Sequence, residues 1–313
     1  MKMTVLILLC LVLILVPVLV GCANNSTTPN TQETVEETTA PQATTATDVT
    51  YASVPESLSV LFIGNSFSVD TMEHFADIAK AAGVKELFLG NLYVGGCPIA
   101  KHHTFLKYNL PEYKYWQNIG FGWYSQENYI SSVAISSHQW DWIAIQHGSA
   151  GGASSYCNPD DYQKLPELVS MVKELAGENT KIAFNMTWVD EPDARKEIRS
   201  YNNDQLAMLK DVCTVTRDIV ATTPGVDKIS PAGMAIQDAR TAYNGLLTRD
   251  GYHLSKGLGR YIVGLTFFQA LTGCDISGIE WAPDGVTAEE RALAIRAATT
   301  ANQTPYEVVS LAE

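Results

Sequence analysis

From residue 57 onward, short apolar runs alternate with longer segments of helical periodicity, and this alternation restricts the fold more than any other feature of the sequence. The runs are apolar on both sides, which is typical of parallel strands covered by helices on both faces of a sheet. We therefore predict strands at 58–64, 86–93, 141–146, 181–187 and 226–230. No second domain boundary is visible, so the pattern predicts a single α/β domain over residues 57–313 with a parallel sheet.

Helices are predicted at 70–83, 159–177, 192–223 and 255–273, where apolar residues recur three and four positions apart. A last helix in "TAEERALAIRAATTANQ" (287–303) is expected to pack against the sheet without a chemical role. The aromatic stretch from residue 97 to about 127 fits neither pattern. It is predicted to be an insertion or short hairpin over the carboxyl edge of the sheet, where ligands bind in open α/β sheets.

The first 21 residues hold one charge, Lys2, followed by a long apolar run. Such a run fits a retained membrane helix or a signal peptide. It ends in "LVGC", which resembles the lipobox of bacterial lipoproteins, where the chain is cut before Cys and the thiol is acylated. We therefore expect 1–21 to be a lipoprotein signal peptide and Cys22 to carry the lipid. This anchor would hold the protein on the extracytoplasmic face of the bacterial cell membrane, with no other membrane contact.

Residues 22–56 are rich in Thr, Asn, Pro and Glu and contain no Lys or Arg. Such a segment cannot bury enough apolar surface to offset the entropy of ordering. It is predicted to be a disordered tether that lets the folded domain reach a nearby polymer.

The formal net charge is −13, and no basic cluster is present. Nucleic acid and anionic lipid headgroups are therefore poor partners, and a neutral substrate suits the chain better. Four cysteines follow the lipid site, and none forms a C-x-x-C pair, so a zinc ribbon is not indicated. These cysteines are Cys97, Cys157, Cys213 and Cys274. Disulfides and buried free thiols both remain open for them.

The segment "VLFIGNSFSVD" (60–70) leads from a buried strand through a Gly-Asn-Ser turn into helix-forming residues. Ser66 would stand at the carboxyl end of the sheet, which suits a nucleophile. Read alone, the segment allows a second interpretation, in which Ser66 or Ser68 only caps the helix.

The segment "TRDGYHLSKGLGRY" places Asp250 and His253 three residues apart in a loop before a helix. A hydroxyl nucleophile needs a base with a pKa near neutrality, and that base needs a carboxylate to fix its tautomer. One short loop supplies both groups, so the nucleophile interpretation of Ser66 is favoured.

"FIGNSFS" together with "DGYHLS" resembles the SGNH (GDSL-like) hydrolase superfamily, and more narrowly an uncharacterised exported family common in gut bacteria. The resemblance covers most of 58–273 and includes "GNLYVGGCPIAKH", "DWIAIQHGS" and "MTW". It implies a flavodoxin-like, three-layer α/β/α sandwich and a serine hydrolase that needs no cofactor. In this family pattern Ser66 is the nucleophile, His253 the base and Asp250 the carboxylate that orients it.

The resemblance also implies an oxyanion hole formed by the backbone N–H groups of Ser66 and Gly96, with Gly95 as the alternative glycine. The Asn that the superfamily uses as a side-chain donor is missing, because Ala150 stands at its place. Gln146, at the end of a strand, is predicted to replace it, since an amide can donate a hydrogen bond as Asn does. The alternative is that Gln146 only satisfies local backbone groups.

The same likeness places a family histidine at His102, which is expected to line the substrate pocket. Trp123 and Trp188, together with Trp116 and Tyr124, are predicted to form a surface that stacks on a sugar, although aromatic residues more often belong to the core. A metal site built from His102, His103 or His147 with Asp160 or Asp161 lacks a ligand spacing pattern, so no metal is expected.

Together these features predict a lipid-anchored serine esterase that removes O-acetyl or other short acyl groups from a carbohydrate or another small ester. A lipase-like short-acyl esterase is one alternative. A catalytically weak or inactive glycan- or solute-binding lipoprotein on the same scaffold is the other.

Overall fold

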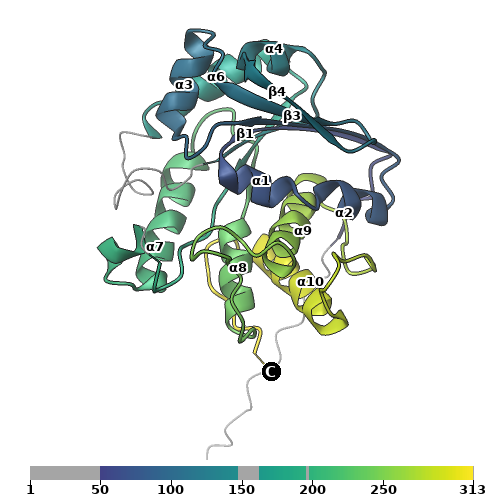
Figure 1. Ribbon diagram of the computed structural model, residues 1–313, viewed down its shortest axis with the longest axis vertical. Coiled ribbons are helices and arrows are strands. Elements are labelled where there is room, and N and C mark those ends of the chain that lie inside the picture. The colour runs from purple at the N-terminus through teal and green to yellow at the C-terminus, as the bar shows by residue number, and fades with distance from the viewer. Residues whose placement is uncertain (1–49, 147–161, 195–196, 313) are drawn as a thin grey trace, which may run out of the picture. The chain divides into compact units, whose positions relative to one another are not determined.

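The computed structural model describes residues 50–146, 162–194 and 197–312. A seven-stranded sheet with the order β4-β3-β2-β1-β5-β6-β7 forms the middle layer (Figure 1). The strands are β1 Ser57–Gly64, β2 Glu86–Tyr93, β3 Tyr113–Asn118, β4 Trp123–Tyr129, β5 Trp142–Gln146, β6 Lys181–Asn185 and β7 Lys228–Ser230. Strands β2, β1, β5, β6 and β7 are parallel, whereas β3 and β4 are antiparallel to their neighbours. The parallel part has the strand order of a flavodoxin-like sheet, with its switch point beside β1.

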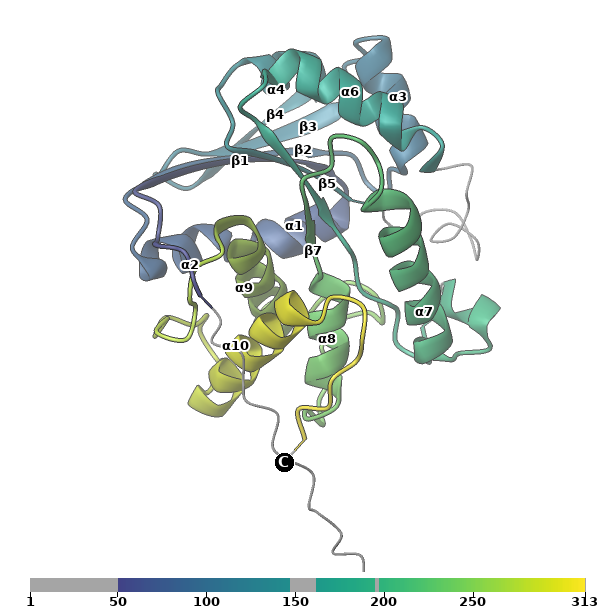
Figure 2. The ribbon, with the colours of Figure 1, turned by 180° about the vertical axis from the view of Figure 1, so that it is seen from behind.

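Helices cover both faces of this sheet, as Figures 1 and 2 show from opposite sides. They are α1 Ser66–Met72, α2 Phe75–Ala82, α3 Ile99–Lys107, α4 Ser131–Ser136, α6 Leu165–Ala176, α7 Gln205–Val215, α8 Ala232–Arg240, α9 Leu258–Thr272 and α10 Ala288–Gln303. Helices α1, α2, α8, α9 and α10 lie on one side and α3, α4 and α6 on the other. The predicted three-layer α/β/α sandwich is confirmed, and the sheet is mostly parallel.

Strand β1 explains why the sheet has two cores. Residues 58–64 are all buried, and because successive side chains point to opposite faces, they divide between two clusters. Val60 and Phe62 pack with α1, α2, α8 and α9, whereas Leu61 and Ile63 pack with α3, α4 and α6.

Several predicted elements differ in extent from those observed. The helix predicted at 70–83 begins earlier, at Ser66, and is divided into α1 and α2. The helix predicted at 192–223 contains a break, because Asn202 and Asn203 have φ angles of 53° and 63°. A left-handed backbone ends a helix, and Asp204 then caps α7 by accepting from two backbone N–H groups.

Two predictions of placement are wrong. The stretch after residue 97 forms α3 and then a β3–β4 hairpin, which extends the sheet beside β2 instead of lying over its carboxyl edge. Helix α10 packs on α8 and α9 (Figure 2), because its buried side chains are alanines apart from Leu293, and such small side chains allow close helix contact. Helix α8 was not predicted.

The folded unit begins before the predicted boundary at residue 57. The Ala52 N–H donates to the Gly273 carbonyl at 2.9 Å, and an isolated β-bridge pairs Ala52 with Cys274. Residues 50–56 therefore belong to the domain and not to the tether. The predicted signal peptide and Cys22 lie outside the described residues; within the described ones, no helix is long and apolar enough to cross a membrane.

The structure decides the state of some of the cysteines that were left open between disulfides and free thiols. Cys213 and Cys274 are buried free thiols, so an arrangement with two disulfides is excluded. Cys97 is buried as well, and Cys157 lies outside the described residues.

Asp238 on α8 is a buried carboxyl whose charge should cost stability. Its Oδ1 accepts from the Val309 N–H at 2.8 Å, while Oδ2 is buried without a hydrogen-bond partner. Burial raises the pKa of Asp238 to about 6, although the Val309 N–H acts in the opposite direction. Because the folded-state pKa is raised, the stability contribution is complete below pH 4 and is lost as pH rises through 6.

We therefore expect Asp238→Asn to stabilise the protein more at pH 8 than at pH 4, by about 1–2 kcal/mol. The amide keeps the acceptor for Val309 and cannot ionise. Urea unfolding of wild type and variant at both pH values measures the difference. An equal effect at the two pH values would show that this carboxyl titrates normally.

Candidate active site

Ser66 is the first residue of α1 and is separated from the end of β1, at the switch point of the sheet, by Asn65 alone. The cap of this helix is Asn65, whose Oδ1 accepts from the Phe67 N–H at 3.0 Å. The interpretation of Ser66 or Ser68 as the cap is therefore wrong. Ser66 is partly exposed, and no hydrogen bond engages its hydroxyl or its N–H within the described structure.

Asn65 joins the turn before α1 to the loop after β2. Its Nδ2 donates to the Cys97 carbonyl at 3.2 Å, and the Val94 N–H donates to the Gly64 carbonyl at 3.1 Å. Gly96 lies inside this loop with a φ of 60°, a left-handed conformation that favours glycine. The structure thus places the loop after β2, which contains the predicted oxyanion donor Gly96, against the turn that carries Ser66.

Asp250 and His253 form the predicted pair. His253 Nδ1 lies 2.7 Å from Asp250 Oδ2, and the His253 backbone N–H donates to Asp250 Oδ1 at 2.8 Å. Partial burial acts to raise the pKa of the Asp250 carboxyl, but the hydrogen bonds and charge of His253 outweigh it and lower that pKa. The carboxylate therefore stays ionised and holds the imidazole in one orientation.

This pair lies beside the start of α1. The ring of Phe67, the residue after Ser66, meets the His253 ring edge to face, with centroids 6.0 Å apart. Within the described residues no hydrogen bond joins the His253 ring to the Ser66 hydroxyl; Asp250 is bound at Nδ1, which leaves Nε2 available for that bond. In serine hydrolases this bond often forms fully only when substrate is bound.

A buried ionic network ties the His253 loop to α1. Asp70 is fully buried, four residues after Ser66, and its Oδ1 accepts from Arg249 at 3.0 Å and from Arg260 at 2.7 Å. Its Oδ2 accepts from the Leu254 N–H at 2.8 Å. Arg249 and Leu254 flank the Asp250–His253 pair on both sides, so Asp70 fixes the pair relative to Ser66.

The sequence interpretation missed this network, although a signal was present. Asp70 and Arg260 each stand within apolar helical segments. Charged side chains are almost never fully buried unless they are paired, so two of opposite sign in apolar segments indicate a partnership.

Gln146 is fully buried at the end of β5, and its Nε2 donates to Asn65 Oδ1 at 2.7 Å. Gly64 allows this close arrangement, since a Cβ there would lie 3.2 Å from the Gln146 side chain and 2.7 Å from Ser68 Cβ. In this structure Gln146 acts on the site through Asn65. A direct contact with an oxyanion stays a prediction.

A double-variant cycle separates these two roles. We expect Gln146→Ala to lower kcat about 10-fold and to cause no further loss in an Asn65→Ala background, because the amide works through Asn65. If Gln146 instead donates directly to the oxyanion, Gln146→Ala should lower kcat by about 10²- to 10³-fold in both the wild-type and the Asn65→Ala background. Steady-state kinetics of the four proteins with an acetyl ester decide between them.

Of two further predicted substrate contacts, the one at Trp188 is wrong and the one at His102 stays a prediction. Trp188 is fully buried, packs on Phe67 with centroids 4.6 Å apart, and donates from Nε1 to the Tyr252 carbonyl at 2.7 Å. It has no face for a sugar, so that prediction is wrong; the residue supports the His253 loop instead. His102 is also buried, with Nδ1 2.8 Å from Tyr113 Oη, and it lines none of the cavities described below.

Trp123 does line a cavity, which lies between α1 and the β3–β4 hairpin. A second cavity, of about 510 Å³, lies at the amino edge of β1, β2 and β5 and includes His138. Among the described residues no group of three or more His, Cys, Asp or Glu side chains could hold a metal ion. His147, Asp160 and Asp161, from the alternative metal set, lie outside the described residues.

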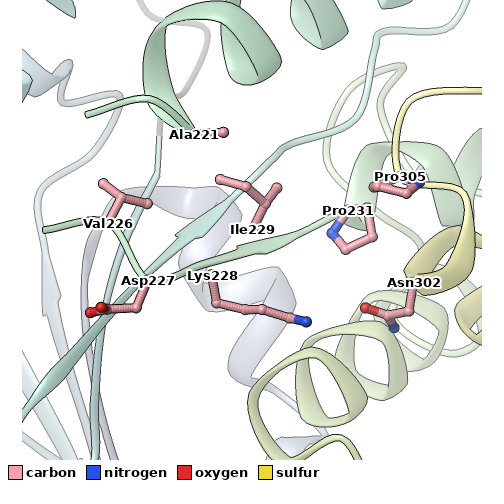
Figure 3. A pocket seen from close by; sticks show the side chains of 8 residues that line it. All are labelled: Ala221, Val226, Asp227, Lys228, Ile229, Pro231, Asn302 and Pro305. Carbon is pink, nitrogen blue, oxygen red and sulfur yellow. The ribbon is translucent and has the colours of Figure 1, made fainter. Parts of the chain in front are cut away.

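A third cavity, of about 230 Å³, lies beside the edge strand β7 (Figure 3). In Figure 3 Lys228 extends toward Asn302, while Asp227 points away from them. Asp227 is already bound to Lys173 and to the Ile182 N–H, at 2.8 Å and 2.7 Å. The described residues that line this cavity include no serine, cysteine or histidine, so it offers no pair of nucleophile and base.

Both the sequence and the fold resemble those of known proteins. Residues 59–301 match the family described as a domain of unknown function, DUF4886. A DUF4886 family protein from Bacteroides uniformis is 30% identical, with a TM-score of 0.76 over 82% of this chain and 98% of that one. A GDSL-like lipase from Bacteroides thetaiotaomicron is 12% identical, with a TM-score of 0.40 over 69% of this chain and 87% of that one. No curated protein sequence matches. The chain belongs to the DUF4886 family.

Proposed function

We propose that the protein is a serine ester hydrolase of the SGNH type. The observation that carries this proposal is the Asp250–His253 hydrogen bond of 2.7 Å, on a loop that Asp70 ties to the helix beginning at Ser66. A free serine hydroxyl beside an oriented imidazole is the arrangement that acyl transfer requires.

In the proposed reaction the Ser66 hydroxyl attacks the ester carbonyl while His253 Nε2 takes its proton. Asp250 stabilises the imidazolium, and the N–H groups of Ser66 and Gly96 bind the oxyanion. His253 then gives the proton to the leaving alcohol. A water molecule, deprotonated by the same imidazole, releases the acyl group as a carboxylic acid and restores Ser66.

The proposed substrate is a short acyl ester, most simply an O-acetyl group, on a carbohydrate. The net charge of −13 disfavours polyanionic substrates. The lipobox-like "LVGC" and the polar segment after it support a protein anchored by lipid at Cys22 outside the cytoplasmic membrane. There it would act on polymers within reach of the tether.

A fluorophosphonate probe tests the proposal directly, because it reacts with serines activated by a neighbouring base. We expect one probe per chain, mapped by mass spectrometry to Ser66, together with turnover of p-nitrophenyl acetate. Ser136→Ala, an exposed serine on α4, is the matched control and should label normally. If Ser66 takes no label and no ester is hydrolysed, the proposal fails and the glycan- or solute-binding alternative gains support.

A further inference from the structure

The cavity beside α1 has a mixed lining. It has a volume of about 250 Å³ and is lined by Val69, Met72, Glu73, Asn91, Trp116 and Trp123. Helix α1 forms one wall and strands β2, β3 and β4 form the other. Trp116 stands opposite Asn91 in the β2–β3 register, so the polar and aromatic groups are neighbours.

The helix places this cavity next to Ser66. At about 100° per residue, Ser66, Val69 and Glu73 share one face of α1, and Val69 lies about 4.5 Å from Ser66 along the axis. Phe67 and Asp70 point to the flank that meets the His253 loop. Val69 and Met72 point to the opposite flank, and Glu73 lies between the two, since it also reaches Arg260, the partner of Asp70. Ser66 therefore lies on the surface of α1 between His253, its predicted base, and the cavity.

Some polar atoms of the cavity lining have hydrogen-bonding capacity that no described residue satisfies. Asn91 is 3% exposed, and its Oδ1 lies 2.9 Å from Ser68 Oγ, but no hydrogen bond engages its Nδ2 within the described structure. Glu73 Oε2 pairs with Arg260 at 3.2 Å, which leaves Oε1 as an acceptor. Lys114 lies over the Trp116 ring, 4.7 Å from its centroid, and helps to hold that side chain.

We propose that this cavity binds a neutral sugar ring of the substrate, with the ester carbonyl at Ser66; this inference rests on the proposed esterase function. The indoles of Trp116 and Trp123 offer apolar surface for the C–H face of the ring. Glu73 and the Asn91 amide bind its hydroxyl groups. The volume suits one ring, since sites for larger ligands span about 300–1,000 Å³.

A fatty acyl chain fits this lining less well. It would cover the Asn91 amide and the Glu73 carboxylate without offering them a hydrogen bond, and a polar group covered in this way loses its contact with water without compensation. An anionic ligand would meet the Glu73 charge directly. The cavity therefore favours a neutral polyol over both.

The test compares one ester that carries a sugar with two that do not. For wild type and Trp123→Ala, kcat/KM is measured with p-nitrophenyl acetate, p-nitrophenyl octanoate and a panel of O-acetylated methyl glycosides of xylose, glucose, galactose and N-acetylglucosamine. We expect Trp123→Ala to lower the ratio of kcat/KM for the best acetylated sugar to that for p-nitrophenyl acetate by about 10-fold, mainly through KM. Glu73→Gln should lower the same ratio about 3-fold or more.

Tyr124→Ala is the matched control, since Tyr124 is the next residue on β4, is exposed and lies outside the cavity lining. Its ratio should stay within twofold of wild type. If Trp123→Ala leaves the sugar ratio unchanged for the whole panel, or lowers only octanoate hydrolysis, the sugar site is overturned while the esterase stands.

Binding gives an independent measurement. The unacetylated glycoside that matches the best substrate should quench the tryptophan fluorescence of wild type, with an affinity about 10-fold weaker in Trp123→Ala. If no ester is hydrolysed, the panel of unacetylated glycosides is titrated instead. Binding that depends on Trp123 would then support the cavity although the proposed function had failed, and no binding by any glycoside would overturn the cavity too.

Discussion

Ser66→Ala, His253→Ala and the double variant are expected to lose kcat by the same amount, about 10⁴- to 10⁶-fold with p-nitrophenyl acetate. The losses should not add, because the imidazole accelerates the reaction only by taking the proton of the Ser66 hydroxyl. Once either group is absent, the other has nothing to act on. The four rate constants, measured with the same enzyme preparations, give the coupling directly.

Ser136→Ala and His138→Ala are the controls for this cycle, since both residues lie away from α1 and the His253 loop. Each should change kcat by less than twofold. If Ser66→Ala keeps more than a tenth of wild-type activity, another group is the nucleophile. If the double variant is about as slow as the product of the two single losses, Ser66 and His253 act in separate steps.

The sequence predicted the parallel strands well because each is apolar on both sides and short. Strand β2 was predicted with its observed limits, and β1 differs by a single residue. Asp250 and His253 were recognised because they stand only three positions apart in one loop. Their hydrogen bond needs no long-range contact.

Contacts between distant segments could not be predicted in the same way. Asn65 meets Gln146 across 81 positions, and Asp70 meets Leu254 across 184. Each depends on how β1 pairs with β5 and how α1 packs on α9, which a hydrophobic pattern does not specify. Gln146 was predicted to replace the missing oxyanion-donor Asn; in the structure its amide donates to Asn65, a contact that the sequence did not indicate, and direct contact with an oxyanion stays a prediction.

The identity of residue 65 becomes understandable from these contacts. An aspartate there, as in the usual Gly-Asp-Ser pattern, could accept from Phe67 and Gln146 but could not donate to the Cys97 carbonyl. The asparagine amide does both, and it thereby links the Ser66 turn to the loop that contains Gly96.

Replacement of Asp70 should have the largest effect on stability of any single change near the site. Asp70→Ala removes the shared partner of Arg249 and Arg260 and leaves the Leu254 N–H without an acceptor. Breaking a buried ion pair from one side costs about 3–5 kcal/mol, because the remaining charges stay desolvated. For a domain of this size that loss lowers Tm by about 10 °C.

Replacing Asp70 should also lower kcat. A residue that only stabilised the fold would not need to affect kcat in a variant that stays folded. Asp70→Asn keeps the side-chain shape and an acceptor for Leu254, so it should remain folded at 25 °C. We expect its kcat to be about 10- to 100-fold below wild type, because a displacement of about 1 Å in the His253 loop weakens proton transfer. Chemical denaturation and kcat measured at the same temperature separate the two effects.

Glu56→Gln is the control, since it breaks the exposed Glu56–Lys85 pair of 3.0 Å and should change both the stability and kcat little. Should Asp70→Asn lose stability but keep full kcat, the network would hold the fold together without positioning His253.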